Sequence, residues 1–490
     1  MKTIYEQSRP GRRGDSLPAL DVPQEFVDRE ILAPELCRRE PAELPEAAEV
    51  DVVRHFTRLS RLNFGVDVGT YPLGSCTMKY NPKFCEDLAR LPGMAHLHPL
   101  LPQLRRGGLL AQGALRVLYE TEQLLAAITG MDAYTLQPLA GAHGELTGVM
   151  LMAAYHREKG NKKSVILVPD SAHGTNPASA AIAGYQVVTV PSSGGFMKPD
   201  AFKSMLTDEV AGVMMTNPNT LGLFNPYVKE IAEAAHGKDA LMYYDGANLN
   251  AIMGYAKPGE MGFDIVHLNL HKTFGTPHGG GGPGAGPVGV VKKLEPFLPI
   301  SRVAQRADGT LFLDYDQPKS IGYIAPFYGN FGVILKAYAY ILALGGEGLK
   351  QASQDAVLNA NYLRARLAQH WQVARDQSCM HEVVFTAIDK MEKNGVSALD
   401  VAKALIDQGF HPPTIYFPLV VKEALMIEPT ETESKENLDA FVAAMERIAK
   451  AAEDDPASLH AAPVTTPVGR LDEVKAARSP DLVFAGRSGE

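Results

Sequence analysis

The amino-acid sequence predicts an α/β fold, with a mostly parallel sheet in a large domain and a smaller α/β domain towards the C-terminal end. Two observations support this prediction. Between residues 164 and 291, short apolar runs alternate with segments of helical periodicity, which is typical of parallel strands covered by helices. After residue 331 the pattern changes to long helical segments followed by a few short strands, which indicates a second, smaller unit.

We therefore expect four regions in the chain of 490 residues. These are an extended N-terminal arm over residues 1–60, a large domain over 61–330, a small domain over 331–453 and an extended tail over 454–490. The arm is rich in Pro, Arg and Glu and has few periodic apolar positions. Arms of this kind lie across another domain or subunit, or remain partly disordered.

The composition is that of an ordinary globular enzyme, with 46% hydrophobic and 21% charged residues. A formal net charge of -9 argues against nucleic acid or an anionic membrane as the main partner. The four cysteines, Cys37, Cys76, Cys85 and Cys379, have neither metal-site nor disulfide-framework spacing, and we interpret Cys76 and Cys85 as structural thiols. The sequence shows no secretory signal and no run of about 18 apolar residues, so we expect a cytoplasmic protein without a membrane span.

Two stretches before the regular alternation carry candidate binding groups. Residues 59–83 are interrupted by Gly and Pro but are dense in hydroxyl, amide and amine groups, so a binding loop and a purely structural loop are equally compatible with them. An amphipathic helix is predicted over Gly107–Thr129. The small-residue turn Gly141–Gly144 precedes a predicted helix, Glu145–Glu158, and free N–H groups at such a helix start favour an anion.

The alternating region places polar side chains at the ends of apolar runs. The predicted strands are Ser164–Pro169, Tyr185–Val190, Val210–Met215, Ala240–Tyr244 and Asp264–Leu270. The polar residues that follow such runs include His173, Thr216, Asp245, His271 and Lys272. In open parallel sheets, ligands bind outside the carboxyl ends of the strands. We therefore expect these side chains to gather around one ligand.

Lys272 stands out because it follows a buried strand and precedes a loop with almost no side-chain bulk, His278–Gly286, before a strand resumes at Pro287–Val291. A lysine amine in such surroundings is a candidate Schiff-base nucleophile, whereas an arbitrary lysine after a strand is usually a surface residue. The glycine loop lacks the lysine and hydroxyl residue of a phosphate-binding P-loop, so a nucleotide site of that kind is not expected.

Two further residues fit the chemistry of an electron-withdrawing pyridinium. Asp245 precedes Lys272 by 27 residues and is a candidate partner for a protonated ring nitrogen, although a lone aspartate at this position often only caps a turn. His173 is a candidate stacking platform for the ring, and the alternative is a hydrogen-bonded loop histidine. His271 either contacts substrate or phosphate or only ends the strand, and Thr273 and His278 are within reach of a phosphate.

The C-terminal part shows a separate succession of elements. Helices are predicted over Gly332–Leu344 and Leu349–Gln369, with a break at the Gly345-Gly346 pair. The remaining predicted elements are a strand over Glu382–Ala387, a helix over Ala398–Gln408, strands over Thr414–Val421 and Ala424–Glu428, and a helix over Glu436–Ala451.

Several long motifs resemble the P-protein of the glycine cleavage system, in the split form that consists of two homologous subunits. The motifs are GTYPLGSCTMKYNPK (69–83), AHGTNPASA (172–180), DGANLNAIMG (245–254), HLNLHKTFGTPHGGGGPGAGPVGV (267–290) and EPTETESKENLDAFVAAM (428–445). The resemblance is to subunit 2, and it implies a pyridoxal 5'-phosphate (PLP)-dependent fold type I enzyme of aminotransferase-like architecture, with a seven-stranded, mostly parallel large-domain sheet.

The resemblance also implies roles for individual residues. Lys272 would carry PLP as a Schiff base, Asp245 would pair with the pyridine nitrogen, and His173 would stack on the ring. His271 would help to shape the glycine pocket. Donors to the phosphate or groups near the cofactor would come from Ala142, His143, Thr216, Ala247, Thr273 and His278. Some relatives have Gln in place of His143.

The implied reaction is the decarboxylation of glycine, with release of carbon dioxide and transfer of an aminomethyl group to the lipoyl arm of the H-protein. The implied partners are subunit 1, in an α2β2 heterotetramer, and lipoylated H-protein; no metal, nucleic acid or membrane is expected. Two alternatives remain at this point: another fold type I decarboxylase or lyase with a different amino-acid substrate, and a scaffold subunit that keeps the fold without the chemistry.

Overall fold

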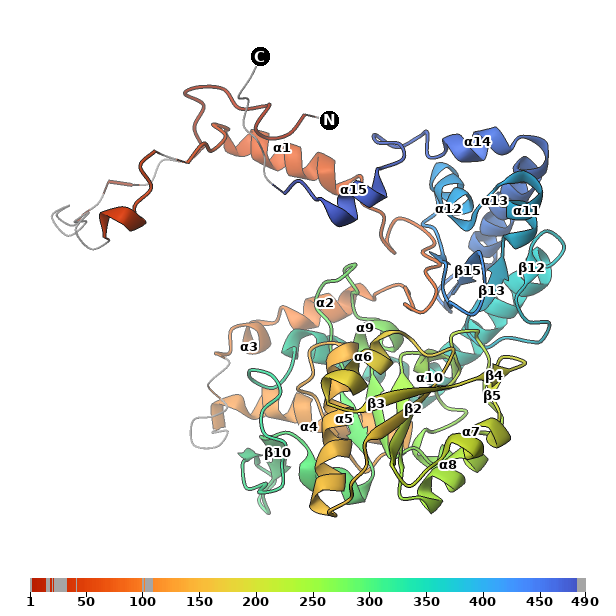
Figure 1. Cartoon of the computed structure of the whole chain (residues 1–490). Helices are drawn as coiled ribbons and strands as arrows, with labels where there is room; N and C mark the ends of the chain where they lie inside the picture. The colour runs from red at the N-terminus through yellow and green to blue at the C-terminus, as the bar shows by residue number, and fades with distance from the viewer. Residues whose placement is uncertain are drawn as a thin grey trace. The chain divides into compact units, whose positions relative to one another are not determined.

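The structure is a computed structural model of the whole chain (Figure 1), and it describes residues 2–14, 18–19, 21, 33–40, 42–98, 101 and 109–482. The chain divides into two compact units. One consists of Met1–Gly65 together with Val464–Glu490, and the other is Val66–Pro463. Each unit is described by itself.

The unit formed by the two ends of the chain contains little regular structure in its described residues. Its elements are η3 (Pro34–Leu36), α1 (Glu49–Ser60) and α15 (Glu473–Arg478). The side chain of Asp51 accepts a hydrogen bond from the Ala48 N–H at the start of α1, which satisfies one of the free N–H groups there. Helix α1 is thus a regular helix within the predicted arm.

The larger unit is built on a seven-stranded sheet with the order β1-β9-β8-β7-β6-β2-β3. The strands are β1 (Ala133–Thr135), β2 (Val165–Pro169), β3 (Gln186–Val190), β6 (Val210–Thr216), β7 (Leu241–Gly246), β8 (Ile265–Leu268) and β9 (Val288–Val290). Only β9 pairs antiparallel with its neighbours β8 and β1, whereas β8, β7, β6, β2 and β3 pair in parallel. The predicted mostly parallel sheet is confirmed.

Helices cover both faces of this sheet (Figure 1). The helices of this part are α2 (Lys83–Ala89), α3 (Pro92–Ala95), α4 (Gln112–Thr129), α5 (Gly141–Glu158), α6 (Thr175–Ile182), α7 (Pro199–Met205), α8 (Val228–Gly237), α9 (Leu270–Thr273) and the first half of α10 (Phe331–Leu367). Shorter elements are η5 (Leu109–Ala111), η6 (Leu249–Ala251), η7 (Gly259–Met261), η8 (Lys292–Phe297), β4 (Ser192–Ser193), β5 (Phe196–Met197), β10 (Arg302–Gln305) and β11 (Leu311–Asp314).

The two faces of the sheet belong to two different apolar cores. Because strand side chains alternate between faces, Met214 and Tyr243 pack with α5 in one core, whereas Met215 and Tyr244 pack with α4, α8 and α10 in the other. All four side chains are buried. Burial on both faces explains why the strands appear in the sequence as continuous apolar runs.

Helix α5 lies unusually close to the sheet because its inner face is made of glycine. A Cβ atom at Gly148 would lie 2.3 Å from the ring of Tyr243, and one at Gly144 would lie 2.7 Å from the backbone oxygen of Gly286. The helix begins at Gly141, so the predicted small-residue turn is the first turn of the helix itself. The close approach brings the start of α5 to the same edge of the sheet as the ends of the parallel strands.

The C-terminal part of this unit is a four-stranded antiparallel sheet of the order β12-β13-β15-β14. Its elements are β12 (Gln372–Val373), β13 (Val383–Thr386), β14 (Thr414–Ile415), β15 (Ala424–Ile427), α11 (Ile388–Asn394), α12 (Ala398–Asp407), α13 (Lys435–Asp454) and α14 (Pro456–Ala461). They pack with the second half of α10 around a core that includes Trp371, Phe385 and Phe441.

Two sequence predictions need correction. The strand predicted over Thr414–Val421 ends at Ile415, because Tyr416 has a positive φ of 58°, which is incompatible with a continuing strand. The strand predicted over Asp264–Leu270 ends at Leu268, and Leu270 already begins the short helix α9. The break predicted at Gly345 is confirmed, since this residue has φ 60° and ψ -175° inside α10.

In the described part of the chain, α10 is the one helix long and apolar enough to pass as a membrane span. Its apolar side chains instead join the two halves of the unit. Ile334 and Ile341 are buried in the core of the large sheet, and Leu363 and Leu367 are buried in the core of the C-terminal sheet. Helix α10 is therefore a core helix.

Candidate active site

Three polar residues lie side by side at the carboxyl ends of neighbouring strands. Thr216 of β6 is in register with Asp245 of β7, which is in register with His267 of β8. The Thr216 hydroxyl donates to Asp245 Oδ2 over 3.2 Å, and His267 Nε2 lies 3.5 Å from Asp245 Oδ1. The parallel register brings these side chains together, as the strand-end argument predicts.

The carboxylate of Asp245 is buried and surrounded by donors. Oδ1 accepts the N–H of Ala247 over 3.0 Å, and Oδ2 accepts the Asn176 side-chain amide over 3.1 Å. Burial by itself would raise the pKa of Asp245, but the His267 imidazole, the Ala247 N–H and the Lys272 ammonium outweigh it, and the pKa is lowered. Asp245 is therefore ionised at neutral pH.

His267 and Asn269 are site residues that the sequence reasoning missed. The Tyr243 hydroxyl lies 2.6 Å from His267 Nδ1, and Asn269 Oδ1 lies 3.0 Å from His267 Nε2. Burial lowers the pKa of His267, and the charge of Asp245 opposes this effect. The signal was present, because His267, Asn269 and His271 alternate with leucine, as expected for one polar face of a strand.

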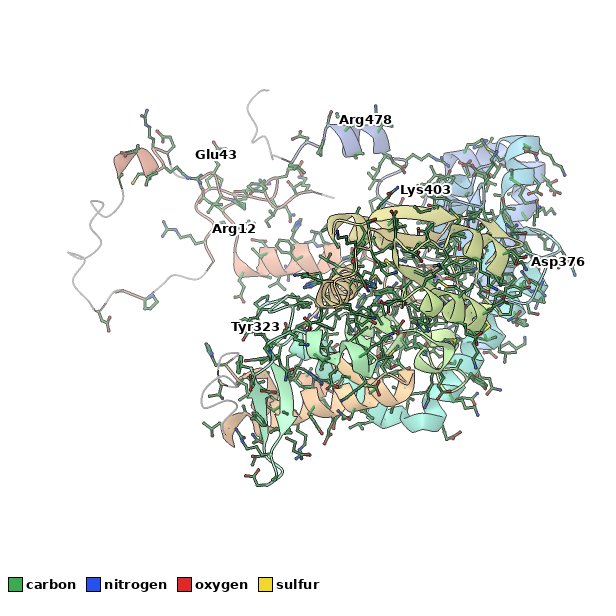
Figure 2. All side chains as sticks on the ribbon, turned by 60° about the horizontal axis from the view of Figure 1, so that its bottom comes forward. Arg12, Glu43, Tyr323, Asp376, Lys403 and Arg478 are labelled. Carbon is green, nitrogen blue, oxygen red and sulfur yellow. The ribbon has the colours of Figure 1, made fainter. Side chains whose placement is uncertain are left out.

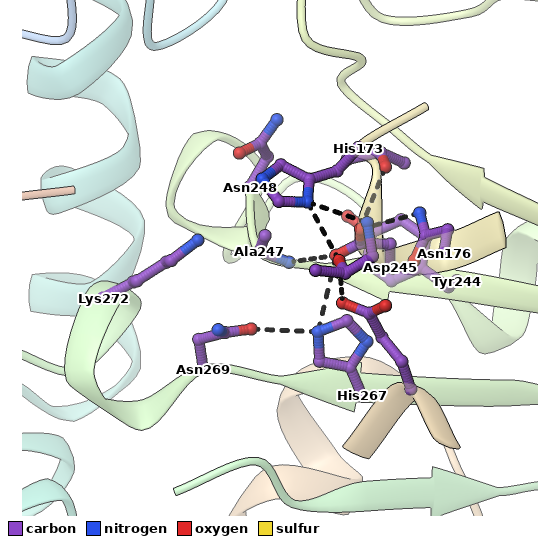
Figure 3. Close-up of polar contacts among 12 residues, drawn as sticks. His173, Asn176, Tyr244, Asp245, Ala247, Asn248, His267, Asn269 and Lys272 are labelled. Carbon is purple, nitrogen blue, oxygen red and sulfur yellow. Dashed lines mark hydrogen bonds and ion pairs between the residues drawn. The ribbon is translucent and has the colours of Figure 1, made fainter. Parts of the chain in front are cut away.

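Lys272 lies in the short helix α9, beyond the end of β8. Its Nζ donates to the backbone oxygen of Ser75 over 2.7 Å. Figure 3 shows the Lys272 side chain directed toward the space beside Asp245 and His173, with the Asp245 carboxylate between His173 and His267. Ser75 lies 197 residues before Lys272 in the sequence. Because its oxygen binds Lys272, the predicted loop 59–83 contributes to the site.

A cavity of about 230 Å³ joins these groups. Seven of the residues singled out in the sequence line it: Lys272, Asp245, His173, His271, Ala142, Thr216 and Ala247. The further lining residues are Ser75, Gly141, Glu145, Thr175, Thr220, Asn248, His267 and Asn269.

The other three predicted residues lie outside the lining of this cavity. His143 accepts a hydrogen bond from the Leu139 N–H on Nδ1 over 3.2 Å and thereby braces the start of its own helix. Thr273 is buried, and its backbone oxygen accepts from Lys79. The His278 ring lies beside that of His271, with the ring centroids 5.5 Å apart.

His271 lies in the cavity wall between the glycine loop and β8. Its Nδ1 accepts the Ala285 N–H over 3.3 Å. Burial, followed by the charge of Lys272, lowers the pKa of His271 to about 4. A neutral ring at this position offers hydrogen bonds and no positive charge at neutral pH.

One end of the cavity is the N-terminus of α5, an 18-residue helix. Gly141 and Ala142 line the cavity, and the N–H groups of the first helical turn have no partner inside the helix. These groups and the helix dipole favour an anionic group, such as a phosphate.

Glu145 is a second buried carboxyl group at the cavity, and the sequence reasoning also missed it. Its Oε1 accepts from the Thr175 hydroxyl over 2.9 Å, and that hydroxyl lies 2.9 Å from Nδ1 of His173. Burial and the nearby charge of Asp245 raise the pKa of Glu145 to about 8. A chain of hydrogen bonds therefore links the His173 ring to a carboxyl group that is mostly protonated at neutral pH.

Solved structures with the same fold define the class of protein. The chain superposes on a glycine decarboxylase (P-protein) of the glycine cleavage system in inhibitor-bound form, with a TM-score of 0.69 and 24% identity over 86% of this chain and 93% of that one. A cysteine desulfurase from Escherichia coli has a TM-score of 0.60 and 15% identity over 78% and 95% of the two chains. The fold is that of the PLP-dependent enzymes of fold type I.

The particular family follows from closer relatives. Family models for the glycine cleavage system P-protein and for the glycine dehydrogenase C-terminal domain match residues 108–309 and 352–461. Probable glycine dehydrogenase (decarboxylating) subunit 2 of Caldanaerobacter subterraneus is 58% identical over 97% of both chains. The corresponding subunit of Desulforamulus reducens is 56% identical over 98% of both chains. The chain belongs to the subunit 2 family of glycine dehydrogenase (decarboxylating), the P-protein of the glycine cleavage system.

Proposed function

We propose that this chain binds PLP through Lys272 and carries the glycine-decarboxylating site of the glycine cleavage system. One observation carries the proposal: a single cavity presents an amine, an ionised carboxylate, a histidine ring and the start of a long helix. These four groups match the aldehyde, the ring nitrogen, the ring face and the phosphate of PLP. Family membership supports the same reaction, because the chain spans nearly the whole length of its relatives.

The donor set of the cavity fits the cofactor. Lys272 would hold the aldehyde carbon, Asp245 the ring nitrogen, His173 the ring face, and the N–H groups at Gly141 and Ala142 the phosphate. Thr216, Ala247 and His271 would complete the lining, with His143, Thr273 and His278 behind it. When bound, PLP supplies an electron sink for the electron pair that is left when a carboxylate departs as carbon dioxide.

The residues around Asp245 keep its charge available for that sink. Three donors, from Ala247, Asn176 and Thr216, hold the carboxylate in place before any ligand enters. Because its pKa is lowered, Asp245 provides a negative charge beside a protonated ring nitrogen across the neutral pH range. Because this charge is already in place, no rearrangement is needed when positive charge develops nearby.

Lys272 and His271 act on the opposite side of the cavity. The Ser75 backbone oxygen accepts a hydrogen bond from the Lys272 amine and thereby orients it. A carbonyl oxygen does this without taking up a proton. The neutral His271 ring, held by the Ala285 N–H, limits the space beside Lys272 and presents no competing cation to a substrate ammonium group.

Within this proposal, glycine loses carbon dioxide and its aminomethyl group passes to the lipoyl arm of the H-protein. The name of the relatives as a subunit 2 supports a subunit 1 partner. We propose an α2β2 heterotetramer of these two subunits in the cytoplasm. The 69–83 loop and the surroundings of His271 would shape the glycine pocket and the approach of the lipoyl arm.

The proposal is tested by exchange of labelled carbon dioxide into the carboxyl group of glycine, with subunit 1 present. Lipoylated H-protein should stimulate the exchange, and alanine or serine in place of glycine should give little. Exchange with another amino acid instead would identify a different decarboxylase. The absence of exchange, with PLP bound and subunit 1 added, would leave a scaffold role.

A further inference from the structure

The stretch Thr70–Tyr80, termed the 70–80 loop, is bound to the C-terminal sheet rather than to its neighbours in sequence. Leu73 forms a bridge with Ile427 of β15. The N–H of Glu428 donates to the oxygen of Pro72 over 3.2 Å, and the Thr414 hydroxyl donates to the oxygen of Gly74 over 2.8 Å. The loop thus lies along β15 as an additional irregular segment.

The backbone of this loop is held in a conformation that it would not adopt by itself. Ser75 and Thr77 have positive φ values of 65° and 47°, which cost energy for residues with a Cβ atom. At Gly74, a Cβ atom would lie 2.2 Å from Cγ of Met426, so the loop approaches β15 more closely than any other residue permits. Such geometry persists only where the surroundings enforce it.

Two buried carboxyl groups enforce it. Glu382 Oε2 accepts the N–H of Ser75 over 2.9 Å. Glu428 accepts the N–H of Thr77 over 3.0 Å on Oε2 and its hydroxyl over 2.6 Å on Oε1. Both glutamates have 1% or less of their surface exposed. The two residues with positive φ are therefore the two whose N–H groups the glutamates bind.

A buried histidine lies between the two carboxyl groups. Nε2 of His381 is 3.9 Å from an oxygen of Glu382 and 3.9 Å from an oxygen of Glu428. Neither ring nitrogen of His381 has a hydrogen-bond partner among the described residues. Burial, followed by the charge of Glu428, raises the pKa of Glu382 well above its ordinary value.

A second anchor fixes the end of the loop beneath Lys272. Lys79 is buried, and its Nζ donates to Asn250 Oδ1 over 2.7 Å and to the backbone oxygen of Thr273 over 2.9 Å. The same Nζ is paired with Glu431. Thr273 is the residue after Lys272 and ends α9. The loop therefore touches the Lys272 segment at two points, through the Ser75 oxygen and through Lys79.

We propose that Glu382 and Glu428 are positioning residues for the Lys272 amine, which they act on through the Ser75–Thr77 backbone. The proposal rests on the function proposed above, in which Lys272 is the reacting amine. The glutamates bind the N–H groups of Ser75 and Thr77, on either side of the Ser75 carbonyl. The oxygen of that carbonyl accepts from Lys272 Nζ, and the amine thereby faces the cavity. Neither glutamate lines that cavity.

The test compares paired substitutions in the full chain together with subunit 1. Thr77→Val removes the hydroxyl bond to Glu428 without leaving a cavity, and Thr77→Ser keeps it. Glu428→Met keeps a side chain of similar length but removes both acceptors, those of the Thr77 N–H and of the Thr77 hydroxyl. Glu382→Met likewise removes the acceptor of the Ser75 N–H, and Thr77→Ser is the matched control.

Two readouts separate positioning from general damage. The first is the rate at which added PLP becomes covalently attached to Lys272, followed by absorbance and by reduction with borohydride. The second is the affinity for pyridoxine 5'-phosphate, which has the ring and the phosphate but no aldehyde to react with the lysine. Thermal unfolding and metal content are measured on the same preparations.

We expect Thr77→Val, Glu428→Met and Glu382→Met to slow attachment by about tenfold to a hundredfold, because small misplacements of a reacting group have effects of this size. Pyridoxine 5'-phosphate affinity should stay unchanged, and Thr77→Ser should behave like the wild type. Attachment at the wild-type rate in Thr77→Val would overturn the proposal, as would an equal loss of pyridoxine 5'-phosphate affinity.

One metal per chain on His381, Glu382 and Glu428 would also overturn it. These side chains are the one group of this kind in the described residues, with potential ligand atoms within 4.8 Å of one another. A wild-type protein that never attaches PLP would instead contradict the proposed function itself.

Discussion

The two sides of Lys272 are built in different ways. On one side, Asp245, Thr216 and His267 come from adjacent parallel strands and meet because the strands are in register. On the other side, the backbone of Ser75 is held through its N–H by Glu382, which lies 307 residues further along the chain. The strand-end side is a direct consequence of the sheet, whereas the loop side forms only when the C-terminal sheet has packed.

This difference has consequences for how the site responds to change. The strand-end groups are fixed by hydrogen bonds among residues that line or adjoin the cavity, and a substitution there acts on the charge or shape of the cavity itself. The loop groups are fixed by a few buried carboxyl groups, and a substitution there acts through the backbone. Figure 2 shows the side chains of the larger unit gathered around its sheets and helices.

The largest effect should come from Lys272, on which both sides converge. Lys272→Ala should lower glycine decarboxylation by at least about a thousandfold, because it removes the nucleophile itself. The measurement is labelled carbon dioxide exchange with subunit 1 and lipoylated H-protein. Lys292→Ala, at a lysine with 81% of its side chain exposed, is the matched control and should leave the exchange unchanged. Exchange at the wild-type rate in Lys272→Ala would contradict the claim that Lys272 is the reacting amine.

The next effect separates charge from shape on the strand-end side. Asp245→Asn should lower kcat by about a hundredfold to a thousandfold, since the neutral amide provides no counter-charge for a protonated ring nitrogen. Thr216→Val removes only one of the hydrogen bonds to Asp245 and should lower kcat by about threefold to tenfold. Equal losses in the two variants would mean that hydrogen bonding, and not charge, is what Asp245 contributes.

A smaller effect concerns the hydrogen-bond chain from His173 to Glu145. Thr175→Val breaks the chain and should lower kcat by about fivefold to twentyfold, because His173 loses the hydroxyl partner that orients its ring. Thr175→Ser keeps the hydroxyl and should be close to the wild type. Exchange kinetics of both variants give the comparison, and similar losses in the two would assign the effect to packing.

The last effect concerns stability rather than activity, and both sides share it because each has a buried carboxyl group with a raised pKa. Glu145 titrates in the folded protein near pH 8, above the ordinary value of 4.5, so the folded state holds a proton that the unfolded state releases between these values. The free energy of unfolding should therefore fall as the pH rises through this window, by up to about 1.4 kcal/mol per pH unit for each such group.

Substitution by glutamine should flatten that slope on either side of Lys272. Glu145→Gln tests the strand-end side and Glu382→Gln the loop side, because burial raises the pKa of both carboxyl groups. Urea unfolding at pH 6, 7 and 8 gives the slope for each protein. A slope as steep as that of the wild type in Glu145→Gln would show that this group does not titrate as described.

The residues of the strand-end side can be predicted from the sequence, because the pattern that indicates them lies next to them in the chain. Thr216 and Asp245 end apolar runs, and the general rule for open parallel sheets brings such residues together. His267 and Asn269 alternate with leucine, and this alternation is the sequence signal that they share one face of a strand. Lys272 was placed at a strand end and lies instead in a short helix, since one turn after β8 gives no periodic signal of its own.

The contacts on the loop side cannot be predicted from residues that are neighbours in the sequence. Ser75 lies in a segment rich in functional groups, which the sequence indicated, but nothing near it in the chain identifies Glu382 or Glu428 as its partners. Each of these glutamates flanks a short apolar strand, a position that has no distinctive period. The strand predicted beyond Ile415 is also wrong, because Tyr416 has a positive φ that its neighbours in the sequence do not indicate.

The most direct test of the account is to treat the PLP-loaded protein with borohydride, which makes the bond between cofactor and lysine permanent, and to map the labelled peptide. The account predicts one labelled site, at Lys272, and no label in Lys272→Ala. Label on a different lysine in the wild-type protein, or no label after PLP has bound, would contradict the central claim that Lys272 is the reacting amine.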